Sequence, residues 1–364
     1  MSETDAATPT TLPRGPISDQ PHVTVIVPAR NEERYIEVFL ENLLQQDYPQ
    51  ERTQILIADG QSTDRTAELV LGFRDRLPNS ELHENVRREK AAGLNLCIPK
   101  ATGELILIMD AHTHYPPNYV SRLVAQLRET GADYVGGCVE TEPGTDSYAA
   151  RAIARALCHP FGVGGGTYRT NSTSGDGLAP FGCYRRELPF AIGGYNECLP
   201  RSEDDEFSAR IKRHGGRCMV CGDVCSTYFA RPTLRALCKQ MFHNGATHIA
   251  TFLELPGHFL LRHYVPFGFV TAVVLGVLLW VFVPGRWELL AAVLAPYLLL
   301  TIASSVHAAM RGGWRYLPAL LVIFPIMHTM YGLGTYWGIL TYGILKRHRR
   351  DGRRSGRQLI QPAG

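Results

Sequence analysis

The sequence lacks a strong charge of either sign. Its 37 Lys and Arg residues nearly balance its 34 Asp and Glu residues, and the net charge at pH 7 is only +3. Nucleic-acid-binding proteins concentrate a much larger positive charge, so we expect no nucleic acid as a partner. Residues 1–20 also lack the apolar core of a signal peptide, being acidic and polar with three prolines. They are predicted to form a disordered N-terminal tail, and the part that follows is expected to stay on the cytoplasmic side.

The nine cysteines show no pattern that demands disulfides. In a domain expected on the cytoplasmic side, they argue against a disulfide framework. Cys218, Cys221 and Cys225, which follow His214, have a spacing that a metal site can use. Apolar residues lie between them, however, and the favoured interpretation is a strand core that uses Cys as a small apolar residue.

Charge is almost absent from three long stretches in the last third of the chain, at residues 265–283, 289–306 and 317–345. Each is long enough to cross a bilayer, which takes roughly 17 to 25 residues. We therefore predict a transmembrane region at 263–345, preceded at 231–262 by a basic amphipathic segment that lies on the membrane surface. The tail at 346–364 is basic and is predicted to be a cytoplasmic flank attracted to anionic lipid, the alternative being a solvated polar tail.

The number of crossings is the open question of this region. Three simple crossings from a cytoplasmic domain would place the basic tail outside, against the positive-inside tendency. The last apolar stretch is longer than one crossing needs and contains Pro325 and several glycines. We therefore favour a re-entrant or doubly crossing hairpin there, which would return the tail to the cytoplasm.

The first two thirds of the chain alternate between apolar runs and amphipathic helices. Residues 23–27, 54–58 and 105–109 read as strands, and the segments 35–44 and 65–77 read as helices. Runs of consecutive apolar residues are typical of parallel strands that helices cover on both faces. Strand, helix and strand in this order predict an α/β domain with a parallel sheet.

Acidic side chains follow each of these strands. Glu32 comes after the first, Asp59 and Asp64 after the second, and Asp110 after the third. The carboxyl ends of parallel strands share one sheet edge, so these acids can converge on one ligand, accepting hydrogen bonds from ribose hydroxyls or holding a metal beside phosphates. For Asp64 a helix cap is an equally good interpretation. His112 lies two residues after Asp110, on the same face of an extended chain, where both can reach one divalent ion.

Several ordered motifs resemble those of the family-2 inverting glycosyltransferases. They are Val-Pro-Ala-Arg-Asn-Glu at 27–32, Ala-Asp-Gly-Gln-Ser-Thr-Asp-Arg-Thr at 58–66, Lys-Ala-Ala-Gly-Leu-Asn at 90–95, Met-Asp-Ala-His at 109–112, Gly-Gly-Tyr-Asn-Glu at 193–197 and Glu-Asp-Asp-Glu-Phe-Ser-Ala-Arg-Ile at 203–211. The resemblance covers about residues 22 to 250. Asp-Ala-His followed by Pro-Pro, the loop at 159–165 and the C-terminal position of the apolar stretches are most similar to glycosyltransferases of succinoglycan-type exopolysaccharide assembly.

The resemblance implies a GT-A (Rossmann-like) domain at residues 21–230 that binds a nucleotide-diphosphate sugar and a divalent metal. It places Pro28, Ala29 and Glu32 at the nucleoside, Asp59 at the base, Lys90 and Asn95 near the diphosphate or sugar, and Asp110 with His112 at the metal. The family usually has a second Asp where this chain has His112. Imidazole is a softer ligand than carboxylate, so we expect Mn²⁺ to be preferred over Mg²⁺. His114 is a weaker candidate ligand.

Inverting transfer also needs a base that deprotonates the acceptor hydroxyl. The resemblance points to Asp204, with Glu203 on the acceptor side, although four acids in a row also suit a solvated helix start. Gln240 falls where related enzymes have a Gln near the acceptor. Arg169, in the glycine-rich stretch 162–169, is a candidate contact on the acceptor side or at the diphosphate, the alternative being a flexible linker.

These observations predict a membrane-anchored glycosyltransferase that adds one sugar to a lipid-linked saccharide in exopolysaccharide or cell-envelope glycan synthesis. The Gln-x-x-Arg-Trp motif of processive synthases is absent, and no apolar stretch precedes the domain, which argues against a polymerase. The resemblance favours a UDP-sugar, with glucose as the leading choice, and an inner-membrane, multi-pass protein whose catalytic domain is cytoplasmic. The alternatives are transfer to a polyprenyl phosphate, which needs no strong base, and a non-catalytic scaffold that only binds sugar nucleotides.

Overall fold

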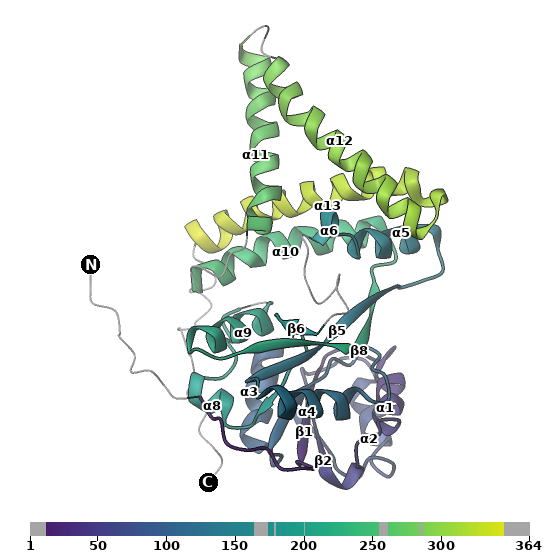
Figure 1. Ribbon diagram of the computed structural model, residues 1–364, viewed down its shortest axis with the longest axis vertical. Coiled ribbons are helices and arrows are strands. Elements are labelled where there is room, and N and C mark those ends of the chain that lie inside the picture. The colour runs from purple at the N-terminus through teal and green to yellow at the C-terminus, as the bar shows by residue number, and fades with distance from the viewer. Residues whose placement is uncertain are drawn as a thin grey trace, which may run out of the picture. The chain divides into compact units, whose positions relative to one another are not determined.

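The computed structural model describes residues 12–163, 174–177, 180–199, 201–254, 261–283, 285 and 287–345 (Figure 1). These residues fall into two compact units. Residues 12–140 and 174–228 form the first, which we call the sheet unit. Residues 141–163 and 229–345 form the second, which we call the helical unit.

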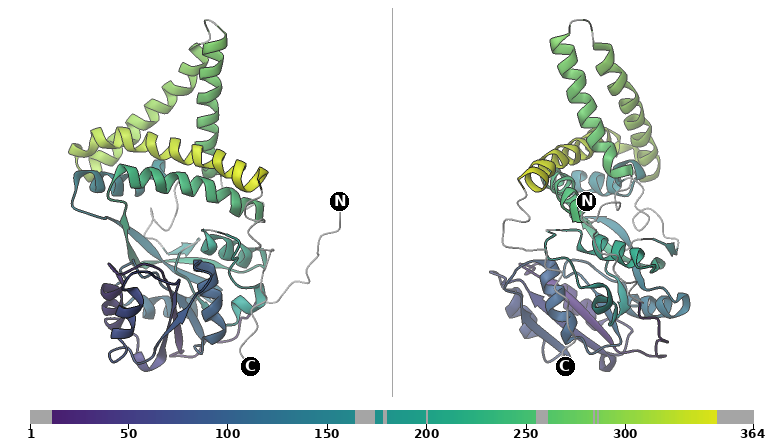
Figure 2. Two further views of the ribbon diagram at one scale, coloured as in Figure 1. Left: turned by 180° about the vertical axis from the view of Figure 1, so that it is seen from behind. Right: turned by 90° about the vertical axis from the view of Figure 1, so that its left-hand side faces the viewer.

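An eight-stranded mixed sheet organises the sheet unit, with the strand order β3-β2-β1-β4-β7-β5-β8-β6 (Figures 1 and 2). The first four strands along the chain are parallel neighbours: β1 (Val23–Ala29), β2 (Thr53–Asp59), β3 (Ser80–Glu84) and β4 (Leu105–Ile108). The others are β5 (Tyr134–Pro143), β6 (Gly175–Asp176), β7 (Cys183–Arg185) and β8 (Cys218–Ala230). Strand β7 is antiparallel to both β4 and β5. The α/β prediction is confirmed, with an antiparallel half that the sequence pattern did not indicate.

Helices cover both faces of the sheet, which explains the continuous apolar strands. One core contains Val23, Val25 and Val27 of β1 and residues of α1 (Ile36–Leu44), α2 (Thr66–Gly72) and α4 (Tyr119–Thr130). The opposite core contains Ile26 and residues of α3 (Lys90–Cys97), α8 (Leu188–Ile192) and α9 (Glu203–Arg213). Short 3₁₀ turns, η1 (Gln50–Arg52) and η2 (Ile98–Lys100), precede β2 and follow α3. Side chains that alternate along a strand enter opposite cores, so a strand between two helical layers is apolar throughout.

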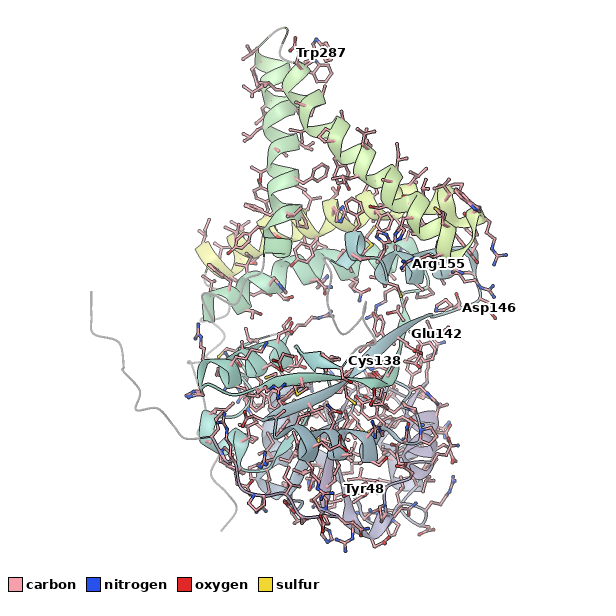
Figure 3. All side chains as sticks on the ribbon, in the orientation of Figure 1. Tyr48, Cys138, Glu142, Asp146, Arg155 and Trp287 are labelled. Carbon is pink, nitrogen blue, oxygen red and sulfur yellow. A yellow bond between two sulfur atoms is a disulfide. The ribbon has the colours of Figure 1, made fainter. Side chains whose placement is uncertain are left out.

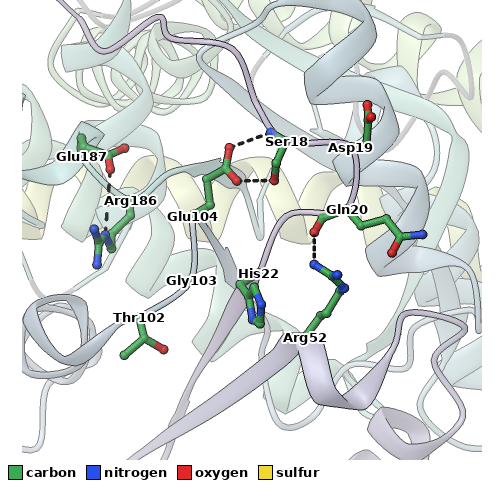
Figure 4. A pocket seen from close by; sticks show the side chains of 10 residues that line it. All are labelled: Ser18, Asp19, Gln20, His22, Arg52, Thr102, Gly103, Glu104, Arg186 and Glu187. Atoms are coloured by element: carbon green, nitrogen blue, oxygen red, sulfur yellow. Dashed lines mark hydrogen bonds and ion pairs between the residues drawn. The ribbon is translucent and has the colours of Figure 1, made fainter.

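Residues 12–20 lie against the sheet unit, where the sequence predicted a disordered tail. Leu12 is buried in the second core, and Arg14 pairs with Asp133 at 3.4 Å. The Ser18 amide donates to Glu104 at 2.9 Å, at the rim of an open depression of about 580 Å³ beside the start of β1 (Figure 4). The prediction relied on polar composition and missed that a single Leu can anchor such a segment. Residues 1–11 lie outside the described residues.

The cysteines also differ from expectation at one place. Cys138 on β5 and Cys225 on the neighbouring β8 form a disulfide (Figure 3 labels Cys138). The sequence argued against a disulfide framework and did not indicate this single pair, because the two positions become close only when β5 and β8 pair. Cys218 and Cys221 are buried on β8, as expected for small residues in a strand core.

Apart from the ends of β5 and β8, the regular elements of the helical unit that the structure describes are helices and helical turns. They are α5 (Tyr148–Leu157), α6 (Pro160–Val163), α10 (Leu234–Glu254), α11 (Leu261–Phe282), α12 (Trp287–Gly312), the 3₁₀ turn η3 (Trp314–Tyr316), α13 (Leu317–Gly338) and the π-helical turn η4 (Ile339–Ile344). Residues 264–282, 287–312 and 314–344 are long and apolar enough to cross a membrane. Three candidate spans indicate membrane association, as the sequence predicted.

The third candidate span is one continuous helix and not the hairpin that the sequence favoured. Pro325 lies inside α13, which continues directly into η4. Its glycines allow close packing on α10 and do not reverse the chain. A Cβ on Gly334 would lie 2.0 Å from the Phe242 carbonyl oxygen, and one on Gly338 would lie 2.5 Å from that of Ala246. Only glycine permits two helix backbones to approach this closely.

Candidate active site

The candidate site lies at the carboxyl edge of the parallel strands, all within the sheet unit. β1 ends at Ala29, β2 at Asp59 and β4 at Ile108, two residues before Asp110. Ala29 and Asp59 are direct partners in the register of β1 and β2. Open α/β sheets bind their ligands at this edge, so the topology alone brings the acids of separate motifs together.

Lys90 is the central cation of the site. It is the first residue of α3, and its Nζ lies 2.9 Å from Asp110 Oδ1 and 3.0 Å from Glu203 Oε1. Burial opposes the charge of Lys90, but the two carboxylates outweigh this effect and raise its pKa. Lys90 therefore remains charged and joins the strand-end acid to the acidic motif on α9.

His112 lies near these charged side chains and pairs with Glu32. Its Nδ1 donates to Glu32 Oε1 at 3.1 Å, and about half of its side chain is exposed. The hydrogen bond to Glu32 raises the pKa of His112, burial opposes the rise, and the charge of Asp110 adds to it. The structure thus forms two pairs of predicted site residues, Glu32 with His112 and Asp110 with Lys90, whose charges act on one another. Glu203 extends the second pair.

Asp59 is held in place by its own loop. Its carboxylate accepts from the Ser62 amide at 3.1 Å and from the Ser62 hydroxyl at 2.5 Å. The same Ser62 hydroxyl accepts from the amide of Asn31, whose φ is +56°. Asn tolerates this left-handed conformation better than most residues. The loops after β1 and β2 are thereby locked together beside Pro28 and Ala29. The neighbouring Asp64 accepts from the Thr66 amide at 3.1 Å and from the Glu33 amide at 3.2 Å, so it adds a second link between the two loops.

Asn95, which the resemblance placed near the diphosphate or sugar, has its side chain engaged in hydrogen bonds within the protein. Its Nδ2 donates to the Tyr195 carbonyl and to Glu197 Oε1, both at 2.8 Å, and its Oδ1 accepts from the Tyr195 amide. The residue is buried. Asn95 thus holds the segment around Tyr195 in place, and Glu197 in turn pairs with Arg87.

Arg210 holds the same segment from the other side. This buried arginine on α9 makes two bonds with Glu206, at 2.7 and 2.8 Å. It also donates to the carbonyls of Ile192, Gly193 and Gly194 at 2.6 to 2.9 Å. Its planar, forked guanidinium can satisfy all these acceptors at once. Arg210 is therefore a positioning residue that fixes the two glycines against the acidic start of α9.

Asp204 lies in the first turn of α9, between two other acids. Burial raises the pKa of Asp204 to about 8, and the charges of Glu203 and Asp205 add to the rise. Lys90 acts in the opposite direction. The Asp205 amide donates to Asp204 Oδ1 at 2.9 Å. A carboxyl group whose pKa lies near neutrality is suited to remove a proton from a hydroxyl.

The donor set at Asp110 and His112 fits a divalent ion bound together with a diphosphate. Such ions need only one or two protein ligands when phosphate oxygens supply the others. In the structure the Asp110 carboxylate is paired with the Lys90 ammonium at 2.9 Å. Among the residues that the structure describes, no three His, Cys, Asp or Glu side chains are arranged to hold an ion. This argues against the cysteine cluster as a metal centre.

Three predicted residues remain. Arg169 falls outside the described residues. Gln240 is on α10 of the helical unit. His114 is exposed, and its backbone pairs with Thr227. Sequence reasoning missed the roles of Arg87 and of the Asn95 amide. The Gly-Gly-Tyr-Asn-Glu motif was a signal that this segment matters, but it did not show what holds the segment.

Comparisons with known proteins agree with this geometry. Residues 24–186 match the family described as Glycosyl transferase family 2. The chain is 28% identical over 326 residues to the succinoglycan biosynthesis protein ExoA of Rhizobium meliloti, which covers 87% of this chain and 95% of that protein. It is 23% identical to a dolichyl N-acetyl-α-D-glucosaminyl phosphate 3-β-D-2,3-diacetamido-2,3-dideoxy-β-D-glucuronosyltransferase of Methanococcus voltae, over 72% of this chain and 84% of that protein.

A solved structure shares the fold. The mannosyltransferase PcManGT of Pyrobaculum calidifontis, determined with GDP-Man and Mn²⁺, superposes with a TM-score of 0.56 at 22% identity and covers 91% of each chain. The expected GT-A fold is thus confirmed. The family match and these relatives together identify the chain as a glycosyltransferase with a family-2 domain at residues 24–186.

Proposed function

We propose that this glycosyltransferase moves one sugar from a nucleotide-diphosphate sugar, UDP-glucose first among them, to a lipid-linked saccharide at the membrane, with inversion. The observation that carries the proposal is the pair of contacts from Lys90 to Asp110 and to Glu203. They join the strand ends, which we propose bind the donor, to the acidic motif, which we propose lies on the acceptor side. A domain that only stored nucleotides would not need this connection.

Each residue has a part in the proposed reaction. Asp59 accepts from the base and Glu32 from the ribose, while Lys90 contacts the diphosphate. Asp204 takes the proton from the acceptor hydroxyl as the hydroxyl oxygen attacks the anomeric carbon, and the nucleoside diphosphate leaves from the opposite face. Asp110 and His112 would hold a divalent ion, Mn²⁺ in preference to Mg²⁺, which supplies charge stabilisation for the leaving diphosphate.

A lipid-linked acceptor explains why the enzyme carries membrane helices. The Methanococcus relative is described as acting on a dolichyl-phosphate-linked sugar, and the Rhizobium relative is named for an exopolysaccharide. For the topology we propose that only α11 and α12 cross the inner membrane. The α11 and α12 spans are each 11% buried, whereas the third span, which packs along α10, is 39% buried. Two crossings return the basic tail to the cytoplasm, on the side proposed for the catalytic domain.

The test is nucleotide release by the full chain in lipid discs. UDP-, GDP- and dTDP-sugars are offered with a bacterial lipid extract as acceptor, in Mn²⁺, Mg²⁺ or EDTA. Metal-dependent release from one donor, lost in both His112→Ala and Asp204→Asn, supports the proposal and names the sugar. Release that survives in Asp204→Asn points to a phosphate acceptor, which needs no strong base. Release that EDTA does not affect contradicts the metal site.

A further inference from the structure

The helical unit carries a group of four arginines and two histidines where α5 and α6 meet the end of α12 and η3. We call it the cationic cluster, and its members are Arg151, Arg155, His159, His307, Arg311 and Arg315. Among the described residues, only Asp146 makes an ion pair with the cluster, through Arg151 at 2.8 Å. Several positive charges therefore gather without matching acids, which is the charge pattern of an anion site.

The central arginine is held in a fixed position. Arg155 Nε donates to the Gly312 carbonyl at 2.9 Å, and its Nη1 donates to the Arg151 carbonyl at 2.8 Å (Figure 3 labels Arg155). Its guanidinium lies 4.0 Å from the centre of the Tyr316 ring, over its face. Arg315 contacts the same ring at 4.7 Å and donates to its hydroxyl at 2.6 Å. A guanidinium fixed in this way binds an anion at a lower entropic cost than a mobile side chain does.

Two histidines extend the cluster. His159 Nε2 and His307 Nδ1 are 2.9 Å apart, so one ring donates to the other. His307 and Arg311 lie one turn apart on α12 and are both exposed. Burial lowers the pKa of His159, and the neighbouring His307 and Arg311 lower it further. Cations already repel one another here, and a bound anion would relieve this repulsion.

Apolar surface begins directly beside the cluster. On α12, Leu298, Leu299, Leu300 and Met310 are 51 to 68% exposed. Trp314, which follows the helix, is 60% exposed. Trp side chains in such positions lie at the level of lipid head groups. An anion at the cluster would thus be next to a hydrocarbon-binding face.

We propose that the cationic cluster binds the diphosphate head group of a prenyl-linked saccharide, with the prenyl chain along α12. The proposal deepens the proposed function, on which it rests, by naming residues that hold the lipid end of the acceptor. The exposed Arg311 and Arg315 can each donate to phosphate oxygens in pairs, and Nη2 of Arg155 can add a single donor, so a diphosphate offers enough oxygens for all three.

The test is calorimetric binding to the full chain in neutral detergent. Farnesyl diphosphate is the probe, with farnesol and inorganic diphosphate for comparison, and EDTA keeps divalent ions out of the candidate active site. Arg311→Gln and Arg315→Gln each remove one exposed charge of the cluster. Arg235→Gln removes another exposed arginine, which lies on α10, and serves as the matched control. We expect each cluster variant to bind farnesyl diphosphate about tenfold more weakly, with the control unchanged.

The comparisons separate the sources of any binding signal. Wild-type binding of farnesyl diphosphate that clearly exceeds that of farnesol and of inorganic diphosphate supports the proposal. Equal binding of inorganic diphosphate, or equal weakening in Arg235→Gln, overturns it, as does wild-type affinity in Arg311→Gln. Nucleotide release from the donor is measured in the same preparations. If the wild type releases nucleotide and Arg311→Gln still binds farnesyl diphosphate with wild-type affinity, the role of the cationic cluster is refuted and the transferase proposal stands. If no nucleotide is released but Arg311→Gln binds farnesyl diphosphate more weakly, only the transferase proposal is refuted.

Discussion

Replacing Lys90 by Met should separate the donor side of the site from the acidic motif. Lys90 makes two charged contacts, at 2.9 Å to Asp110 and 3.0 Å to Glu203. A hydrogen bond to a charged group contributes about 1.5 to 3 kcal/mol. One third of the Lys90 side chain is exposed, so we take the lower value for each contact. Losing both contacts should then lower the free energy of unfolding by roughly 3 kcal/mol. The fold should survive, since the charges lie at the sheet edge.

The functional effect should be on donor affinity. In the proposed complex Lys90 contacts the diphosphate, and losing one such contact should raise the donor Kd by about 10- to 100-fold. The assay is calorimetric titration of the preferred nucleotide sugar in Mn²⁺, together with kcat/KM. Lys100→Met is the matched control, because Lys100 is exposed on η2.

The contacts themselves can be tested with a double-mutant cycle. Lys90→Met and Glu203→Gln should be coupled in thermal stability, because each removes the partner of the other. A Lys90→Met variant that binds the donor within twofold of wild type would refute the assignment of Lys90. Strictly additive effects of the two substitutions would refute the contact with Glu203.

Three further predictions concern the base, the positioning arginine and the helix packing. The pKa of the Asp204 carboxyl is raised to about 8, so the fraction of Asp204 in the basic form increases as the pH rises, and kcat/KM should increase between pH 6 and 9. Asp204→Asn should lower kcat about 10²- to 10⁴-fold and flatten this pH profile. A flat profile of the wild-type enzyme would contradict the role of Asp204 as the base. Arg210→Met leaves Glu206 buried without its partner and should lower the free energy of unfolding by about 3 to 5 kcal/mol, measured by thermal or denaturant unfolding. Arg210→Lys should restore little of this loss. A loss below about 1 kcal/mol would be inconsistent with the observed contacts. Gly334→Ala should lower the melting temperature of the full chain in detergent, because its Cβ would lie 2.0 Å from the α10 backbone. Gly268→Ala, whose Cβ would have no atom within 4 Å, should not lower it and is the control. Equal melting temperatures of the two variants would argue against the packing of α13 on α10.

The sequence by itself predicted the α/β sheet unit, the strand-end acids and the candidate membrane spans. These features depend on local patterns that a linear chain displays. Continuous apolar runs at 23–27 and 105–109 mark strands covered on both faces, and the residue after such a strand lies at the sheet edge. The candidate site residues Asp59 and Asp110 were found in this way, and the family resemblance added Lys90 and Asp204.

Only the tertiary structure decided which distant side chains meet. Separate elements are joined by the contact of Lys90 with Glu203, by the hydrogen bonds from Arg210 to two glycine carbonyls and by the disulfide between Cys138 and Cys225. The same holds for Gly334, which looked like a residue for a turn and instead permits two helices to touch. A local pattern reports which face of an element is apolar, but the partner on that face depends on how the whole chain packs. For this reason the sequence indicated the chemistry of the site, and the fold determined how its charges are connected.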